Sequence, residues 1–158
     1  MSQEPTTAPN RIAIHRIYTK NHQFMVQLTP DAIPQPWLPQ MELQANPRYI
    51  QLNSGNYEVT LALQIKAQQN EQGLFEIYIE QAGLFTLEGI AENQRDTVLY
   101  GACPNLLFPY ATATLNLLLS QAALPPVYLA PLDFVALHAQ HQKQQASAAQ
   151  MPVVKTVN

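Results

Sequence analysis

The sequence predicts an α+β domain in which the first half of the chain forms an antiparallel sheet and the second half forms helices. Apolar and polar residues alternate over residues 57–66 and again over 74–80, which is typical of half-buried strands. After Gly89 this alternation is lost. Between Asp96 and Asp133 the chain has no Asp, Glu, Lys or Arg, and residues 110–124 read as one apolar helix. Strands that precede helices in this way favour a segregated sheet and helical layer.

Two strands of weaker alternation are expected first, around residues 11–28 and 41–52. The segment between them contains the prolines Pro30, Pro34, Pro36 and Pro39. Proline lacks the N–H group that a sheet ladder requires, so this segment is predicted to be a crossover loop.

The third and fourth strands are predicted to form a hairpin. Tyr57 to Lys66 alternates from its first residue to its last, and the stretch from Leu74 to Glu80 does so again. Residues 70–73 supply the turn, because Asn and Gly favour turn conformations.

The predicted helix over 110–124 is apolar on nearly every side, with Pro109 expected in its first turn and Pro125 after its end. A surface helix of a monomer shows a single apolar stripe. We therefore expect one side to lie on the sheet and the other on a second copy of the chain. A membrane span is disfavoured because it needs about 20 consecutive apolar residues, and this run includes Asn116 and Gln121.

A second helix is expected to start at Asp133, whose carboxylate suits a helix N-terminus. Its apolar stripe holds Phe134 and Leu137, and glutamines follow. We expect residues 11–143 to form one domain, between a flexible N-terminus of residues 1–10 and a flexible C-terminal tail of residues 144–158. The first ten residues lack the basic start and apolar core of a secretory signal, so a cytoplasmic protein is expected.

Composition narrows the function classes. Charged residues make up 12% of the chain, against about 25% in typical domains. The net charge is −3, and the eight basic residues form no cluster, which argues against nucleic-acid binding. The single cysteine, Cys103, has no internal partner for a disulfide.

Few residues suggest catalysis or metal binding. Cys103 would need a base such as His15, His22, His138 or His141 beside it to act as a nucleophile, and a buried, inert thiol is the commoner outcome. His138 and His141 have a spacing that metals use, but no acidic or cysteine partner lies near them in sequence. With five glycines there is no glycine-rich phosphate loop. No enzyme, cofactor or metal is therefore expected, although a thiol enzyme or small-molecule binder using Cys103 stays open as an alternative.

Aromatic side chains are the remaining candidates for function. Trp37 lies in the proline-rich crossover, where it either lines a groove or plugs the edge of the core. Phe85, Phe108, Tyr110 and Phe134 pose the same choice. Exposed apolar patches of several hundred Å² generally mark binding sites.

Five segments resemble the protein-export chaperone family SecB, in the same order and at similar spacing. They are RIYTK at 16–20, YEV at 57–59, GLF at 83–85, CPNLLFPYA at 103–111 and LAPLDF at 129–134. The resemblance covers roughly residues 11 to 140, and the CPNLLFPYA segment is its most specific part.

The resemblance implies a four-stranded antiparallel sheet with a long and a short helix, assembled as a homotetramer that is a dimer of dimers. It implies a chaperone that keeps preproteins unfolded in the cytoplasm, without nucleotide, and hands them to the SecA motor. A long apolar groove would bind extended segments of many sequences. By position and chemistry, the groove candidates are Trp37, Phe85, Leu107, Phe108, Phe134 and Leu137. The subunit contact is expected at Leu115, Leu118 and Leu119.

The sequence departs from the family at the face where SecA docks. The resemblance places that face at Asn21, Met25 and Tyr78, with Glu76 beside them, where family members carry acidic side chains. Fewer carboxylates weaken electrostatic attraction to a basic partner. An alternative function is therefore a SecB-like chaperone dedicated to another client, such as the antitoxin of a toxin pair, without SecA docking.

Overall fold

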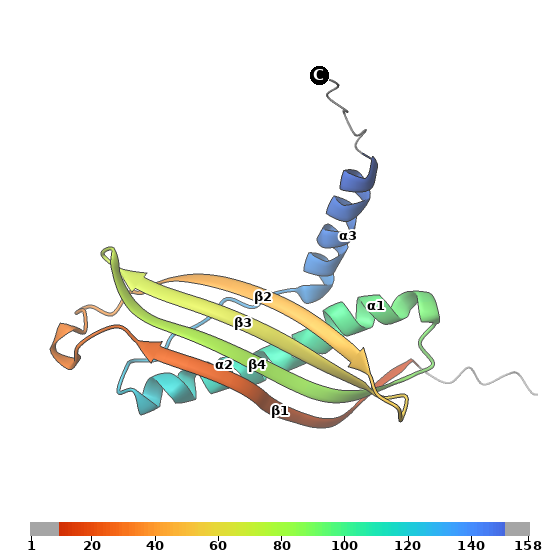
Figure 1. The fold of residues 1–158 in the computed structure, drawn as a ribbon, viewed down its shortest axis with the longest axis horizontal. Helices are drawn as coiled ribbons and strands as arrows, with labels where there is room; N and C mark the ends of the chain where they lie inside the picture. Colours follow the sequence, from red (N-terminus) through yellow and green to blue (C-terminus); the bar gives the residue numbers. More distant parts are fainter. Residues whose placement is uncertain (1–9, 151–158) are drawn as a thin grey trace, which may run out of the picture.

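The computed structural model describes residues 10–150. Four antiparallel strands form one sheet in the order β1-β4-β3-β2. Their bounds are β1 Arg11–Val26, β2 Gln40–Gln51, β3 Tyr57–Gln69 and β4 Gln72–Glu88. Figure 1 shows these strands as one long, curved sheet, with helix α2 lying along one face. The predicted fold class is confirmed: a four-stranded antiparallel sheet is followed by a long and a short helix.

The crossover between β1 and β2 contains one short 3-10 helix, η1 Pro30–Ala32. Gln69 at the end of β3 holds this crossover in place. Its side-chain amide donates to the carbonyl oxygen of Pro36 at 2.8 Å and accepts from the N–H of Leu38 at 3.0 Å. The proline-rich loop predicted from the sequence is confirmed, and its course is fixed by the neighbouring strand.

The hairpin between β3 and β4 is tighter and longer than the sequence indicated. Asn70 and Glu71 form its turn, with φ of 52° and 64°. Strand β4 continues to Glu88, beyond the predicted end at Glu80. The alternation pattern ended early because Gln81, a polar residue, lies on the buried face, where its exposed fraction is 3%. Its side-chain oxygen accepts hydrogen bonds from the hydroxyls of Thr19 at 3.2 Å and Thr114 at 3.3 Å.

The long helix begins far earlier than predicted. Short turns η2 Glu92–Gln94 and α1 Arg95–Thr97 lead through a π-helical turn, η3 Val98–Ala102, into α2 Cys103–Gln121. The predicted start of this helix after Pro109 is wrong, because Pro109 lies inside α2. Proline removes one N–H from a helix and usually bends or ends it. Here Leu107 and Ala111, two residues to either side of it, are fully buried, and this packing holds the helix together.

The core lies between α2 and the inner face of the sheet. Inward-facing side chains of β3 and β4, such as Leu63 and Ile79, are fully buried against α2 and its preceding turn. Helix α2 packs against β4, β3 and β1, whereas β2 is contacted by η3. The inner face of β2 is consequently only half-buried, at Met41, Leu43, Ala45, Pro47 and Tyr49.

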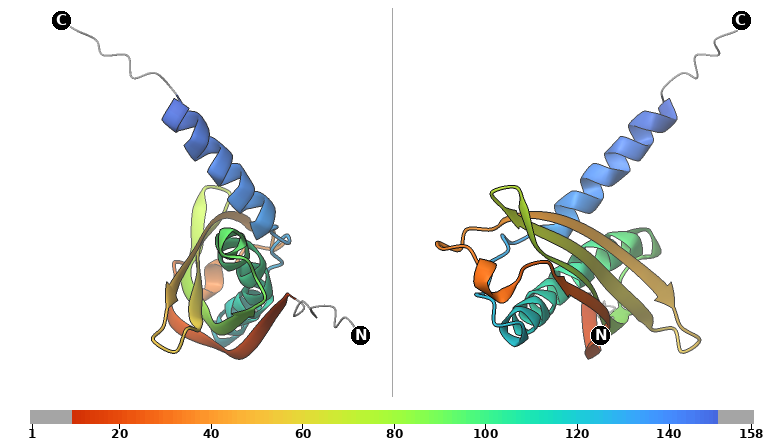
Figure 2. Two further views of the ribbon diagram at one scale, coloured as in Figure 1. Left: turned by 90° about the vertical axis from the view of Figure 1, so that its right-hand side faces the viewer. Right: turned by 60° about the vertical axis from the view of Figure 1, so that its left-hand side comes forward.

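The last helix, α3 Phe134–Gln150, projects away from the body of the domain (Figure 2). Its predicted start is confirmed: Oδ1 of Asp133 accepts a hydrogen bond from the N–H of Ala136 at 3.2 Å. Residues 144–150, which the sequence placed in a flexible tail, are helical. Residues 151–158 of that tail and residues 1–9 of the predicted N-terminal segment lie outside the described residues. Within the described part, no helix has the length and apolar character to cross a membrane.

Candidate peptide-binding groove

A pocket of about 510 Å³ lies between β2 and residues 134–145 of α3. We call it the α3 pocket. The inner face of β2 forms one wall, α1 and η3 form the base, and α3 forms the other wall. Its lining residues are Ala45, Asn46, Pro47, Asp96, Tyr100, Phe134, Leu137, His138, His141, Gln142 and Gln145. The wall of β2 continues along the strand as the half-buried apolar strip described above, so the α3 pocket is one end of a longer apolar surface.

The ring of Tyr100 lies at the base of the α3 pocket and is supported by rings outside the lining. The Tyr49 and Tyr100 rings meet edge to face with centroids 5.1 Å apart, and Tyr49 packs similarly on Tyr57 at 5.8 Å. The Tyr49 hydroxyl donates a hydrogen bond to Oδ1 of Asp96 at 2.7 Å. This bond to the carboxylate, together with burial, raises the pKa of Tyr49 to about 12. The hydroxyl therefore remains a donor at neutral pH and holds Asp96 at the pocket edge.

Helix α3 is attached to the body through its first turns. Phe134 is 2% exposed and packs edge to face against Phe108 with centroids 5.9 Å apart. Its N–H donates to Oδ1 of Asn105 at 2.9 Å. One turn later, the His138 ring stacks on Tyr100 at 5.2 Å. All residues from Ala139 to Ser147 are exposed. This part of α3 therefore has solvent on the side that faces away from β2.

Glycine at position 101 allows this close approach. A Cβ atom built on Gly101 would lie 2.9 Å from a methyl carbon of Val135 and 3.0 Å from its Cα. Real Cβ atoms essentially never come within 3.0 Å of another heavy atom, so the side chain of Val135 would have to move. The absence of a side chain at residue 101 therefore lets the π-helical turn and α3 pack this closely.

The predicted groove residues separate into two groups. Phe85 and Leu107 have no exposed surface and Phe108 is 8% exposed, so these three belong to the core. Phe134 and Leu137 line the α3 pocket; Phe134 is 2% exposed and also belongs to the core, whereas Leu137 is 44% exposed. Residues of the first group are buried because α2 packs onto the inner face of β4. The sequence did not show that α2 covers this face.

Trp37 lies in the crossover loop and is half-buried, as predicted for a residue at the core edge or in a groove. Its ring stacks on Phe75 with centroids 6.5 Å apart and an angle of 17° between planes. Its indole N–H is buried and has no hydrogen-bond partner among the described residues. A buried donor without a partner is uncommon in native proteins, which keeps Trp37 a candidate contact for a bound chain.

The residues that sequence reasoning missed are Tyr49, Asp96 and Tyr100. The alternation of β2 could have placed Tyr49 on the inner face, because odd-numbered positions there carry the apolar side chains. Tyr100 gave no such signal. It lies in a π-helical turn, whose period differs from the 3.6-residue repeat used to recognise helix faces.

The outward side of α2 carries an apolar stripe, which we call the α2 stripe. Its members are Leu106, Tyr110, Ala113 and Leu117, of which Leu106 is 39%, Tyr110 52% and Leu117 60% exposed. Their spacing of four and three residues places them on one helix face. A hollow of about 340 Å³ separates this stripe from Ile17 and Thr19 of β1.

The residues predicted for the subunit contact lie elsewhere on this helix. Leu115 and Leu119 have no exposed surface and belong to the hydrophobic cluster between α2 and the sheet, and Leu118 is 9% exposed. They form part of the core rather than an available surface. The sequence correctly indicated a helix apolar on two sides, but it did not reveal which leucines point outward.

The predicted docking residues come together on the outer face of the sheet, which is the face opposite α2. Met25 pairs with Glu76 across β1 and β4, and Tyr78 lies two residues farther along β4, opposite Gln23. Asn21 faces Glu80 in the same way. These positions therefore form one contiguous patch, as the predicted docking face requires.

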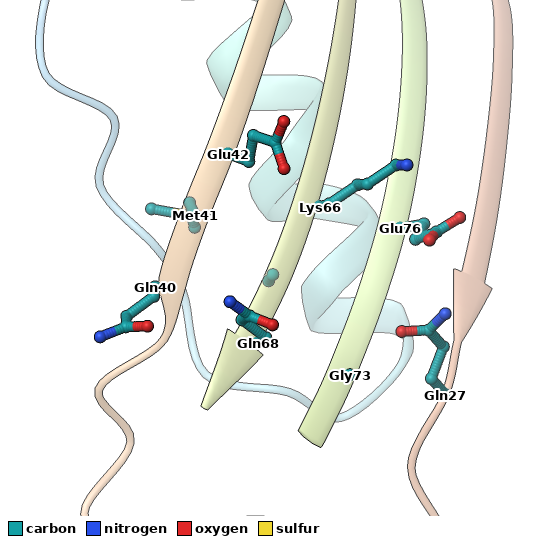
Figure 3. Close-up of a pocket in the computed structure, with 9 residues that line it drawn as sticks. Gln27, Gln40, Met41, Glu42, Lys66, Gln68, Gly73 and Glu76 are labelled. Atoms are coloured by element: carbon teal, nitrogen blue, oxygen red, sulfur yellow. The ribbon is translucent and has the colours of Figure 1, made fainter. Parts of the chain in front are cut away.

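A mixed-charge row crosses this outer face. Glu42 of β2 pairs with Lys66 of β3, which pairs with Glu76 of β4, and Met25 of β1 completes the row. Figure 3 shows Lys66 between the two glutamates, beside a shallow hollow of about 260 Å³. One ammonium between two carboxylates reduces the negative potential that a basic partner would meet.

Two other carboxylates of the outer face are paired within the subunit. Glu58 accepts from the Lys20 ammonium at 2.7 Å and from the Tyr18 hydroxyl. These bonds lower the pKa of Glu58, and burial together with the same carboxylate raises the pKa of Tyr18 to about 12.

The second pair likewise joins a glutamate to a basic side chain and a tyrosine hydroxyl. Glu80 accepts from the Arg48 guanidinium and from the Tyr78 hydroxyl, at 2.7 and 2.8 Å. These bonds lower the pKa of Glu80, with Arg48 as the larger cause. Each of the two carboxylates therefore stays ionised but is neutralised by a cation of its own subunit.

Cys103 begins α2 and has no exposed surface. Burial raises the pKa of its thiol to about 12, so the thiol is protonated at neutral pH. A thiol is a nucleophile as its thiolate. Of the histidines considered beside it, His15 is exposed and bonds to the Thr86 hydroxyl at 2.6 Å. The arrangement around Cys103 is that of a packed core residue.

The histidine pair on α3 also lacks the other features of a metal site. Within the described residues, no three His, Cys, Asp or Glu side chains gather closely enough to hold a metal ion. The Nε2 atom of His141 lies 3.0 Å from the side-chain amide nitrogen of Gln145, and His138 is held by its stacking on Tyr100.

Comparisons with known proteins agree with this architecture. The family model for SecB, described as a preprotein translocase subunit, matches residues 5–145. A solved structure of a SecB-like chaperone from Mycobacterium tuberculosis, in complex with a ChAD peptide from the HigA1 antitoxin, is similar in fold. Its TM-score is 0.66 and its sequence identity 22%, over 77% of this chain and 91% of that one. At this identity the structural likeness supports the fold.

Proposed function

The chain belongs to the SecB family, and from this premise we propose that it is an ATP-independent chaperone that holds unfolded preproteins in an export-competent state. The observation that carries this proposal is the α3 pocket, with its aromatic base and its continuation along the half-buried inner face of β2. An extended apolar segment of an unfolded chain matches such a strip, whereas a folded protein buries the side chains that would enter it.

We further propose that the protein works as a homotetramer, a dimer of dimers. The α2 stripe supports this, because Leu106, Tyr110 and Leu117 expose apolar surface on one side of a helix whose other side is packed. Covering the stripe with a second copy removes that surface from water. Several grooves in one assembly then bind one unfolded chain at several points, which raises the overall affinity.

Delivery to the SecA motor in the cytoplasm is the first candidate for what happens to a bound client. The outer-face patch of Asn21, Met25, Glu76 and Tyr78 is the surface that would dock the motor. Met25 is 53% exposed and supplies an apolar contact there.

A second candidate is a chaperone dedicated to one client, such as an antitoxin, without SecA docking. One observation favours it: Glu58 and Glu80 are each paired with a cation of the same subunit, and Lys66 lies between Glu42 and Glu76. A basic partner gains little from carboxylates that are already neutralised.

The holding activity is tested by light scattering, after a chemically unfolded protein is diluted into buffer with or without the chaperone. We expect the chaperone to suppress aggregation without nucleotide. Leu137→Glu places a charge in the α3 pocket and is expected to weaken suppression severalfold, whereas the matched variant Gln140→Glu, on the same helix outside the pocket, should behave as the wild type. Unsuppressed aggregation with the wild-type protein would refute the proposal.

Calorimetric titration with the SecA motor of the same cell separates the two candidates. Heat that saturates, and that is lost in Met25→Lys but kept in Gln140→Lys, supports delivery to SecA. Full holding activity with no detectable SecA binding removes the first candidate and leaves the second.

A further inference from the structure

Residues 122–133 join α2 to α3 without a helix or strand of their own, and we call them the connector. The connector runs behind the sheet from the end of α2 to the start of α3 (Figure 1). Its residue Val127 is 3% exposed, and Leu129 and Leu132 pack against the core. Within the described residues, the connector N–H groups that bond to other backbone groups are those of residues 122–124. A partly buried segment of this kind needs side chains as hydrogen-bond partners.

Two asparagines of α2 supply these partners. The side-chain amide nitrogen of Asn116 donates to the carbonyl oxygen of Val127 at 3.0 Å, and its Oδ1 accepts from the N–H of the same residue at 3.0 Å. Oδ1 of Asn105 accepts from the N–H of Phe134 at 2.9 Å. Phe134 is the first residue of α3 and lines the α3 pocket. One asparagine therefore holds the connector near its start, and the other holds the first residue after its end.

The spacing of the two asparagines fits the course of the connector. They are eleven positions apart in α2, which is about three helical turns, so they lie on one face about 16 Å apart along the axis. Val127 and Phe134 are seven positions apart, and such a segment reaches at most about 25 Å. The later asparagine holds the earlier connector residue. The connector therefore runs antiparallel to α2 and is long enough to join the two points along that face.

The position of α3 depends on this attachment. Residues 139–147 are exposed, so the pocket wall opposite β2 is placed from its first turns. Besides the bond to Asn105, those turns are held by the contact of Phe134 with Phe108 and by the stacking of His138 on Tyr100. A wall that is already in place favours binding, because ordering a mobile segment on binding costs affinity.

We propose that Asn105 and Asn116 are positioning residues of the α3 pocket, which hold the connector and α3 in the arrangement that receives an unfolded client. This inference rests on the proposed chaperone function. It adds two residues that lie outside the lining to those that form it. Without either side chain the lining keeps its composition, but a client has to order the wall as it binds.

Alanine at each position removes the hydrogen bonds without weakening α2, because alanine is the better helix former. Fluorescence anisotropy measures binding of a labelled, permanently unfolded small protein. We expect Asn105→Ala and Asn116→Ala to weaken this binding about three- to tenfold, as the loss of one or two hydrogen bonds allows. Amide hydrogen exchange should become faster at Phe134 in the first variant and at Val127 in the second.

Thr112→Ala is the matched control. Thr112 lies between the two asparagines in α2, and its hydroxyl donates to the carbonyl oxygen of Phe108 in the same helix at 3.0 Å. This variant also loses a side-chain hydrogen bond from α2, but that bond does not reach the connector. It should bind the unfolded protein as the wild type does.

Aspartate at the same two positions separates positioning from a general loss of stability. Asn105→Asp keeps the oxygen that accepts the N–H of Phe134, at a helix end that favours a carboxylate. Asn116→Asp replaces the amide donor to the carbonyl of Val127 by a second oxygen. Both variants add the same charge to α2. We expect Asn105→Asp to bind the unfolded protein as the wild type does, and Asn116→Asp to bind it at least as weakly as Asn116→Ala.

Unchanged client affinity in Asn105→Ala would overturn the positioning role, and so would equal affinities of the two aspartate variants. The Asn105 variants decide the question alone if a change at Asn116 prevents folding. Unchanged exchange in β3 and β4 shows that a variant is folded. If the wild type does not bind the unfolded protein, the chaperone function itself is refuted.

Discussion

The ring of His138 stacks on the ring of Tyr100, with centroids 5.2 Å apart and an angle of 18° between their planes. This contact joins α3 to the π-helical turn that precedes α2. Beyond it, residues 139–147 are exposed on every side. The attachment of the pocket wall to the rest of the domain therefore depends on a few side chains at its start.

Replacing His138 by alanine is expected to loosen α3 while the rest of the domain stays folded. Amide hydrogen exchange should become faster over residues 134–142 by severalfold, because aromatic pairs contribute about 0.5–1.5 kcal/mol. The exchange of β3 and β4 should not change. A variant with unchanged exchange in α3 would show that the stacking contact does not hold the helix.

Leu117→Asp and Leu118→Asp should have different effects, because Leu117 lies on the exposed side of α2 and Leu118 on its buried side. Leu117 is 60% exposed on the α2 stripe, so a charge there is expected to reduce the mass of the assembly in light scattering while the subunit remains folded. Leu118 is 9% exposed in the core, so the same charge should lower the free energy of unfolding by about 3 kcal/mol or more. Gln64→Glu, on the exposed outer face of the sheet, is the control for added charge. If the Leu117→Asp variant keeps the mass of the wild-type assembly, the α2 stripe is not the contact between subunits.

The pairs Lys20–Glu58 and Arg48–Glu80 predict a dependence of stability on pH. The cations lower the pKa of each glutamate in the folded state, so the pairs stabilise the fold above the carboxyl pKa of the unfolded chain, about 4.3. This contribution is lost as the pH falls through the lowered pKa of the folded state. Lys20→Met and Arg48→Met should each cost about 0.5 kcal/mol at pH 7, and the cost should vanish in acid. The measurement is urea unfolding at several pH values.

The control for these two variants is Lys66→Met. Among the described residues Lys66 forms no ion pair, although Glu42 and Glu76 flank it in register. Its replacement should change stability at pH 7 less than that of Lys20 or Arg48. If Lys20→Met or Arg48→Met lowers the free energy of unfolding equally at pH 7 and in acid, lost side-chain packing, rather than lost charge, is responsible.

The thiol of Cys103 should be unreactive in the native protein. Burial raises its pKa to about 12, so the thiolate fraction is negligible at neutral pH. A thiol reagent should modify it after unfolding and only very slowly before. Cys103→Ala should hold unfolded clients as well as the wild type. Rapid native labelling, or loss of holding in a variant that remains folded, would revive a thiol-based function.

The sheet was predictable because its pattern is local. Alternation in β3 and β4 identifies both strands, and the turn residues between them identify the hairpin. The pattern failed where tertiary contacts override it. Gln81 is polar but buried through hydrogen bonds to two threonines, and Pro109 lies in a helix that packing holds together.

The candidate site was less predictable than the fold. Leu137 and Phe134 line the α3 pocket, whereas Phe85 and Leu107 are buried by α2. An apolar residue has the same sequence signature whether it faces a core or a groove. Which of the two it faces depends on how α2 is rotated on the sheet, and a helix apolar on two sides does not encode that rotation clearly.

Calorimetric titration with two forms of one small protein tests the central claim most directly. One form folds, and the other is kept permanently unfolded by substitutions that leave its apolar segments intact. We predict saturable binding of the unfolded form without nucleotide and no binding of the folded form. Binding of both forms with equal affinity, or of neither, would contradict the account that this protein grips unstructured polypeptide in the groove beside α3.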